Sequence, residues 1–410
     1  MKKYTRLLFI LALCGMVFAA HAATNAAPDK SSGVLPKRGE DAAKAISMVT
    51  GVAISPLLGV GVVGAWEWFS VKSAERARLP WFASPWFWVP ALLIVLAIGV
   101  KDLAGTGLPP GVKKPIDALE VVENKISGLI AAGAFVPLVA SIFSSPSGDG
   151  GAVSAGLGQL ASSWVGGLGL AAIDGSALWN LLAVPLALVA FIFVWLASHA
   201  INILILISPF GVVDAALKSF RLFLMSLLAG VTFVNPYAGA VFALVIIVAA
   251  YFLAGWAMRL SVFGSVYIWD FLTLRRRRFT PSPQANWMFL SRAVDSAPIR
   301  TYGQLSRESE GRLVFAYRPW LLLPRRTLTL PPGNYAVGRG LFYPEILSLE
   351  AEGKTRTIFI LPPRYRTHEN ELKESYRFSE VRDVGLLHGL KAIWAWTKGL
   401  FGFRAAPRPV

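Results

Sequence analysis

The feature that most constrains this chain is a series of long apolar runs between residues 46 and 274. A helix needs about 20 apolar residues to cross the hydrocarbon core of a bilayer, and several of the runs reach that length. Over all 410 residues, 55% are hydrophobic, only 16% are charged, and the mean hydropathy is +0.54. A soluble protein of this size is rarely so apolar. The sequence therefore predicts an all-α polytopic membrane bundle.

About seven transmembrane helices account for these runs. The predicted spans are residues 46–69, 81–100, 126–143, 152–173, 177–207, 210–234 and 237–258. An amphipathic stretch, 260–274, then leads into four consecutive arginines. Because Lys and Arg concentrate in cytoplasmic loops, this arginine run and the loop with Lys72 and Arg76 indicate a cytoplasmic C-terminus and a periplasmic mature N-terminus.

The first 22 residues have the pattern of a signal peptide. Lys2 and Lys3 precede a short apolar stretch that ends in Ala20-His21-Ala22, a typical cleavage site. An uncleaved first helix is the alternative. Residues 23–45 are then a periplasmic arm of a bacterial inner-membrane protein. The only cysteine, Cys14, lies in the signal peptide, so the mature chain is expected to form no disulfide or thiolate metal site.

Small residues recur at four-residue spacing on one face of two predicted spans. The first span carries Gly51, Ser55 and Gly59, and the fourth carries Gly158, Ser162 and Gly166. Such faces let helix backbones approach closely, so we expect both to be packing surfaces.

The spans also resemble two sets of three. Because three is odd, the second set would cross the membrane in the opposite sense, as in the inverted repeats of transporters. This arrangement places Asp117 near the outer surface and Asp214 near the inner one. The alternative is coincidence, since small faces and prolines are frequent in membrane bundles.

Residues 46–274 carry three short motifs of one known family. These are Gly-Val-Ala-Ile-Ser-Pro-Leu-Leu-Gly at 51–59, Ala-Ser-Pro-Trp-Phe at 83–87 and Pro-Ile-Asp-Ala-Leu at 115–119. In them the chain resembles an uncharacterised bacterial membrane family, domain of unknown function 4126. The resemblance implies a membrane fold and no established activity.

Polar side chains within or beside apolar spans are costly in lipid and are therefore candidates for function. The candidate transmembrane polar site consists of Asp117, Glu120, Glu123, Asn124, His199, Asn202, Asp214 and Lys218. Each has a structural alternative: a solvated face for the first four, a packed histidine beside Asn202, and an i,i+4 ion pair for the last two.

Enzymatic chemistry has little support in the sequence. The three histidines after the signal peptide, His199, His368 and His388, have no metal-ligand spacing, and no nucleophile or phosphate-binding motif is present. We expect no metal, no cofactor and no catalytic residue.

The segment 275–410 predicts a small β-rich cytoplasmic domain with a C-terminal helix. Alternating segments at 312–318, 326–330 and 355–361 predict strands, and 384–401 predicts the helix. With 23 Lys and Arg against 11 Asp and Glu, the segment supplies +12 of the net charge of +16. Such a surface suits anionic partners, and lipid is favoured over nucleic acid because no nucleic-acid motif accompanies the charge. The predicted contacts to anionic lipid are Arg275, Arg276, Arg277, Arg278, Lys391 and Lys398.

Two functions remain open at this point. A transporter or channel is expected to contain paired polar groups inside the bundle, whereas a membrane scaffold that docks lipids or protein partners is expected to have a sealed apolar bundle.

Overall fold

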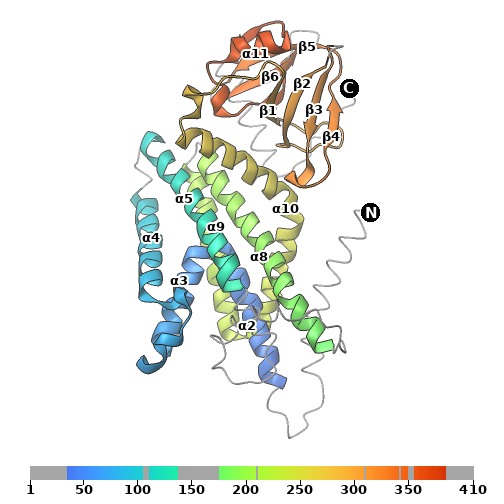
Figure 1. The fold of residues 1–410 in the computed structure, drawn as a ribbon. Coiled ribbons are helices and arrows are strands. Elements are labelled where there is room, and N and C mark those ends of the chain that lie inside the picture. Colours follow the sequence, from blue (N-terminus) through green and yellow to red (C-terminus); the bar gives the residue numbers. More distant parts are fainter. Residues whose placement is uncertain are drawn as a thin grey trace. The chain divides into compact units, whose positions relative to one another are not determined.

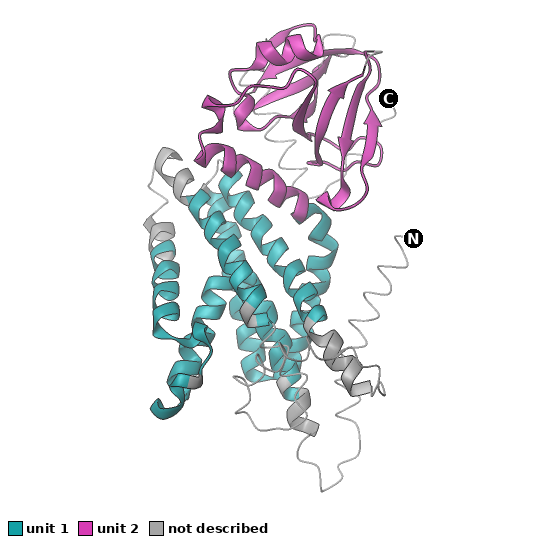
Figure 2. Ribbon diagram, in the orientation of Figure 1, with its two compact units in different colours: residues 1–257 teal, residues 258–410 magenta. Residues whose placement is uncertain are grey.

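The computed structural model describes residues 35–104, 110–136, 175–208, 211–308, 311–340, 343–349 and 355–384. The predicted signal peptide, the fourth predicted span and the predicted terminal helix lie outside these residues. The chain divides into two compact units, residues 1–257 and 258–410 (Figure 2). The second unit thus begins before residue 275, where the sequence predicted the soluble domain to start.

The first unit is helical (Figure 1). Its described helices are α2 (Leu35–Ile54), α3 (Pro56–Ser70), α4 (Pro85–Ala104), α5 (Pro110–Ile130), α8 (Gly175–Ile207), α9 (Gly211–Val234) and the first part of α10 (Pro236–Leu272). Short 3-10 turns, Ser73–Arg78 and Trp81–Ala83, join α3 to α4, and α5 continues as a π-helical segment, Ala131–Phe135.

Three described helices are long and apolar enough to cross a membrane. These segments are Pro185–Ile207, Val212–Val234 and Pro236–Leu272, and two shorter apolar helices cover Ala42–Ile54 and Pro85–Ile98. The chain therefore has the character of a membrane protein. Seven spans are not seen among the described residues.

The first predicted span, 46–69, is not one helix, and this prediction was wrong. The chain is helical from Leu35, which the sequence assigned to a polar arm, and the helix ends at Ile54. Ser55 adopts φ −143° and ψ 88° between α2 and α3. The cause is Pro56, which has no N–H to donate to Val52 and which excludes the helical region for the residue before it.

Two further helix boundaries differ from the prediction. Helix α5 begins at Pro110, whereas the sequence predicted a span that starts near residue 126. The prediction missed the first half of this helix because that half is amphipathic and its average hydropathy is low. Helix α10 runs unbroken from Pro236 to Leu272, so the last predicted span and the amphipathic stretch after it form one helix.

The glycines of the first unit differ in how closely they pack. A Cβ atom at Gly59 would lie 2.8 Å from Val52 across the break, whereas one at Gly51 would make only an ordinary 3.8 Å contact with Leu228. The tightest approach is at Gly64, where a Cβ would clash with the backbone carbonyl of Phe82. Gly158, Ser162 and Gly166 lie outside the described residues.

The second unit is built on one mixed sheet of eight strands (Figure 1). The strands are β1 (Ala285–Leu290), β2 (Tyr302–Arg307), β3 (Leu313–Tyr317), β4 (Arg326–Thr329), β5 (Asn334–Arg339), β6 (Pro344–Leu349), β7 (Thr355–Ile360) and β8 (Val381–Asp383). Their order is β4-β3-β2-β1-β7-β6-β5-β8, and only β5 and β8 pair in parallel. The three predicted strands are confirmed as β3, β4 and β7.

Two helices complete the core of the second unit. The short helix α11 (Glu369–Tyr376), which the sequence did not predict, buries Leu372 and Tyr376. From the end of α10, Phe263 packs edge-on against Phe289 at 5.0 Å between ring centroids, and the Tyr267 hydroxyl donates to the Leu361 carbonyl at 3.1 Å. The last turns of α10 are therefore part of this domain's core.

Candidate functional site: a polar layer between three helices

The helices α5, α8 and α9 bring polar side chains together inside the first unit. We call this set the polar layer; its members are Glu120, Asn124, His199, Asn202, Lys218 and Arg221. On α5 the buried residues Asp117, Val121 and Asn124 recur at helical spacing. One face of this amphipathic helix is thus buried although it carries several polar groups.

His199 is fully buried on α8 and joins that helix to α5. Its Nδ1 lies 3.0 Å from the Asn124 Oδ1 atom. Since an amide oxygen only accepts, Nδ1 carries the proton in this pair. The imidazole stacks on Trp195 at 5.2 Å, and the Trp195 indole N–H donates to the Asn124 backbone carbonyl at 3.3 Å. Gly128 is required beside them, because a Cβ there would clash with the Trp195 ring.

Charged side chains extend the layer to α9. Lys218 Nζ lies 3.6 Å from Glu120 Oε2, and both side chains are mostly buried. Three residues further along α9, the Arg221 guanidinium donates to the Asn202 Oδ1 atom at 2.6 Å. Glu123 accepts a hydrogen bond from Ser127 and interacts electrostatically with Arg221. The layer therefore contains opposite charges that partly neutralise each other.

The same turn of α8 also reaches the helix break. The Ser198 hydroxyl donates to the Ile54 carbonyl at 2.5 Å, at the point where α2 ends. A broken helix leaves backbone carbonyls without their helical donors, and in a membrane these must find partners in the protein. Ser198 and His199 thus connect the break, α5 and α8 through adjacent residues.

Several buried polar atoms in or near the layer have no hydrogen-bond partner within the described part of the chain. Among them are His199 Nε2 and Glu123 Oε1. A neutral imidazole with a protonated Nδ1 presents Nε2 as an acceptor. The layer can therefore accept a hydrogen bond from a donor group on a ligand at this atom.

Asp117 and Asp214 are both buried, and the contacts beside them bear on the prediction that they lie at opposite ends of the bundle. Each lies within about 6 Å along its helix axis of Glu120 or Lys218, respectively, and those two residues form an ion pair. Asp117 and Asp214 therefore lie at the same end of the bundle.

The order of the contacts gives the helix directions. Glu120 faces Lys218, and one turn later Asn124 and Arg221 both contact the same turn of α8. Helices α5 and α9 thus run in the same direction. The predicted inverted repeat requires them to be antiparallel, so it does not describe this bundle.

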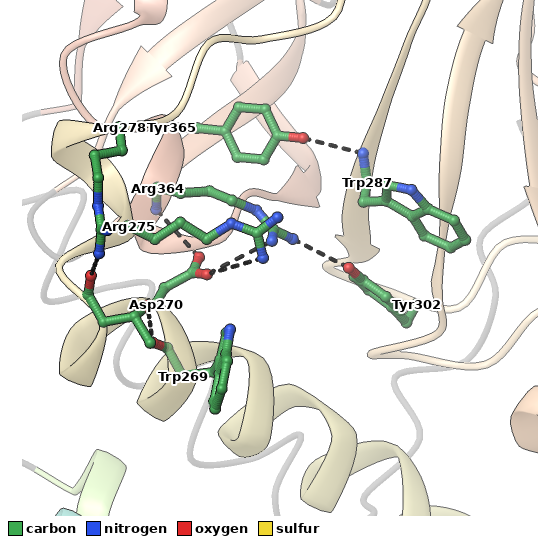
Figure 3. Close-up of polar contacts among 9 residues, drawn as sticks. Trp269, Asp270, Arg275, Arg278, Trp287, Tyr302, Arg364 and Tyr365 are labelled. Atoms are coloured by element: carbon green, nitrogen blue, oxygen red, sulfur yellow. Dashed lines mark hydrogen bonds and ion pairs between the residues drawn. The ribbon is translucent and has the colours of Figure 1, made fainter.

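The predicted lipid-contact residues belong to the second unit, and the structure describes only some of them. Arg275–Arg277 form a short 3-10 turn after α10, and this turn is exposed, as is Arg278. The Arg278 guanidinium donates to the Thr273 carbonyl at 2.8 Å, while Arg275 approaches Asp270 at 4.0 Å (Figure 3). Lys391 and Lys398 lie outside the described residues.

Sequence reasoning missed one buried polar network, which lies in the second unit (Figure 3). Arg364 Nη1 lies 3.5 Å from Asp270 Oδ1, and the Arg364 backbone N–H donates to Asp270 Oδ2 at 3.3 Å. The Arg364 Nη2 group donates to the Tyr302 hydroxyl at 3.1 Å. Asp270 is nearly inaccessible. Its only signal in the sequence is a single acid on the apolar stretch before the arginine run.

Within the residues that the structure describes, no group of three or more His, Cys, Asp and Glu side chains could hold a metal ion. Comparison with protein-family models, curated proteins and solved structures finds no match for this chain. The resemblance of residues 46–274 to domain of unknown function 4126 stays a prediction.

Proposed function

We propose that the first unit moves a small ion or polar solute across a bacterial inner membrane, and that the polar layer is its binding site. The observation that carries this proposal is the pairing of Glu120 with Lys218 and of Asn124 with His199 between helices of an apolar bundle. Charged and amide side chains are costly in lipid, and they occur in membrane helices chiefly where they serve a pathway or a relay.

The helix break supports the same proposal. Transporters bind substrates where helices are interrupted, because the freed backbone groups are available to a ligand. Here the break at Ser55 is joined by Ser198 to the turn of α8 that carries His199.

The chemistry of the layer limits what it would bind. Opposite charges lie close together here, Glu120 with Lys218 in the layer and Glu123 beside it with Arg221, which suits a small solute better than a large charged one. His199 Nε2 offers an acceptor for a hydrogen-bond donor on a small solute. We therefore favour movement of a small ion or a small polar molecule over that of a large charged solute.

The test is a flux assay on the full-length protein reconstituted in liposomes. With an imposed membrane potential, an internal pH dye reports protons, and ion-sensitive dyes report potassium and chloride. We expect the wild type to carry at least one of these species. Glu120→Lys and Lys218→Glu should each abolish the flux, and the double exchange should restore part of it because the ion pair re-forms with reversed polarity.

The matched control is the exposed ion pair between Glu40 and Lys44, 2.5 Å apart on α2. An exposed pair contributes little to stability, so Lys44→Met should leave the flux unchanged. If the wild type carries none of the three species, or if the Glu120 and Lys218 variants conduct as it does, the transport proposal is wrong. A membrane scaffold would then be the better reading of the bundle.

A further inference from the structure

The second unit carries a cluster of large apolar side chains that its own core does not use. The connection between β3 and β4 reads Arg318-Pro-Trp-Leu-Leu-Leu-Pro-Arg-Arg326. Its four central residues, Trp320, Leu321, Leu322 and Leu323, are all exposed, and Leu322 is 87% accessible. We call these four residues the loop tip.

The backbone holds the loop tip in a defined conformation. Trp320 and Leu321 have φ angles of 56° and 62°, in the left-handed region that residues other than glycine rarely adopt. Two turn hydrogen bonds, from the Leu321 N–H to the Arg318 carbonyl at 3.0 Å and from the Leu323 N–H to the Pro319 carbonyl at 3.1 Å, keep this shape. Strain of this kind persists where it serves a purpose, and here it presents apolar side chains to the outside.

Basic residues flank the loop tip on both sides. Arg318 precedes it, and Arg325 and Arg326 follow it, and all three side chains are exposed. A tryptophan and leucines between arginines suit the boundary of a bilayer, where apolar groups reach the acyl chains and cations meet lipid phosphates.

A bilayer fits the size of this patch better than a protein partner does. Stable protein interfaces bury about 800 Å² on each side, far more than four side chains supply. A tethered contact needs much less affinity, because the membrane is always present at a high effective concentration. The second unit is so tethered, since it begins at Met258 inside the candidate membrane span Pro236–Leu272.

We propose that the loop tip inserts into the headgroup region of an anionic bilayer, with the three flanking arginines on lipid phosphates. This lipid-binding site is separate from the polar layer and from the arginine run at residues 275–278. It does not depend on whether the first unit transports anything.

The experiment uses the full-length chain in vesicles of phosphatidylcholine and phosphatidylglycerol in equal amounts. In a Cys14→Ser background, Leu322→Cys carries an environment-sensitive fluorophore. Its control, Glu374→Cys, places the same fluorophore at an exposed position on α11. We expect doxyl-labelled lipid to quench the fluorophore at 322 and not at 374, and acrylamide in the water to quench mainly the one at 374.

A charge variant separates electrostatic attraction to lipid from the hydrophobic insertion of the loop tip. With Arg318, Arg325 and Arg326 all replaced by Gln, the ratio of inserted to free loop should fall about fivefold for each arginine removed. High salt should weaken insertion of the wild-type loop, because exposed charges are screened. Equal insertion of wild type and variant into anionic vesicles would overturn the role given to the arginines.

Two results would overturn the bilayer as the occupant. If acrylamide quenches the fluorophores at 322 and 374 equally, nothing covers the loop tip. If the fluorophore at 322 is shielded from acrylamide but is not quenched by doxyl lipid, a protein surface covers it, either in this chain or in a second copy.

Discussion

The two units of this chain bury ion pairs of nearly equal length in different ways. Glu120 and Lys218 in the first unit lie 3.6 Å apart, and Asp270 and Arg364 in the second lie 3.5 Å apart. The second pair is held by a backbone N–H, a tyrosine hydroxyl and Arg275 as well, and it is almost inaccessible. The first retains some accessibility. The second pair is therefore part of a domain core, whereas the first keeps some of its surface accessible, as the proposed binding site requires.

The largest expected effect comes from breaking the second pair. Asp270→Ala leaves Arg364 buried without its carboxylate, and removal of one partner of such a pair costs about 3 to 5 kcal/mol. Hydrogen exchange of the β1 and β7 amides in the full-length protein measures this loss. The double replacement Asp270→Leu with Arg364→Met should recover much of the stability. Little loss from Asp270→Ala would remove the contrast between the two pairs.

The second unit is also expected to lose stability at high pH. Burial raises the pKa of Tyr376 to about 12, and its hydroxyl donates to the Leu305 carbonyl at 2.8 Å. The folded state thus keeps a proton that the unfolded state releases near pH 10, so this stabilisation is complete below pH 10 and is lost as the pH rises to 12. The free energy of unfolding falls by roughly 2 to 3 kcal/mol over this pH range.

Other ionisable groups of the second unit also modify this pH dependence. Burial and the Glu345 carboxylate raise the pKa of Tyr343 to about 12, so this tyrosine acts in the same direction. Burial lowers the pKa of Arg300 to about 10, which has the opposite sign and offsets one tyrosine. Tyr376→Phe should therefore flatten the slope of stability against pH between 10 and 12, as followed by hydrogen exchange. An unchanged slope would show that Tyr376 does not carry it.

A close helix approach in the first unit gives the third effect. Gly64→Ala places a Cβ against the Phe82 carbonyl and should cost about 1 to 3 kcal/mol, because backbone cannot move aside cheaply. The control is Gly230→Ala on α9, where a Cβ would have nothing within 4 Å. Thermal unfolding in detergent compares the two variants. Equal melting temperatures would show that the bundle tolerates movement at this contact.

The smallest expected change in stability, with the largest change in function, is at His199. His199→Phe removes the hydrogen bond to Asn124, and a hydrogen bond between membrane helices contributes only about 0.6 to 1.7 kcal/mol. We expect the variant to stay folded and to lose flux in the liposome assay. If it instead unfolds like Asp270→Ala, the two units use their buried polar groups in the same way.

Patterns with a short period could be predicted from the sequence. The strands β3, β4 and β7 were found from alternation, and α8 and α9 from continuous hydropathy. Hydropathy averaged over a window did not detect the break at Ser55, because Pro56 lies in an uninterrupted apolar run. It also did not detect the first half of α5, because the buried face of that helix contains Asp117 and Asn124.

Contacts between distant parts of the chain carried no local signal. The predicted members of the polar layer do make polar contacts inside the bundle. The sequence suggested an ion pair of Lys218 with Asp214 on the same helix, whereas the structure pairs Lys218 with Glu120 on another helix. Arg221 was not among the predicted site residues, although its guanidinium donates to Asn202. Asp270 and Arg364 are 94 residues apart, and nothing near either residue indicates the other.

That separation has a consequence for how the protein is made. At 5 to 20 residues per second, roughly 5 to 20 s pass between synthesis of Asp270 and synthesis of Arg364. During this interval the last turns of α10 are apolar enough to slip further into the bilayer, while the domain core that will receive them does not yet exist. The unpaired carboxylate of Asp270 opposes that slip, since a charge is costly in hydrocarbon. We therefore expect Asp270 to act first as a stop during insertion and only later as an ion-pair partner.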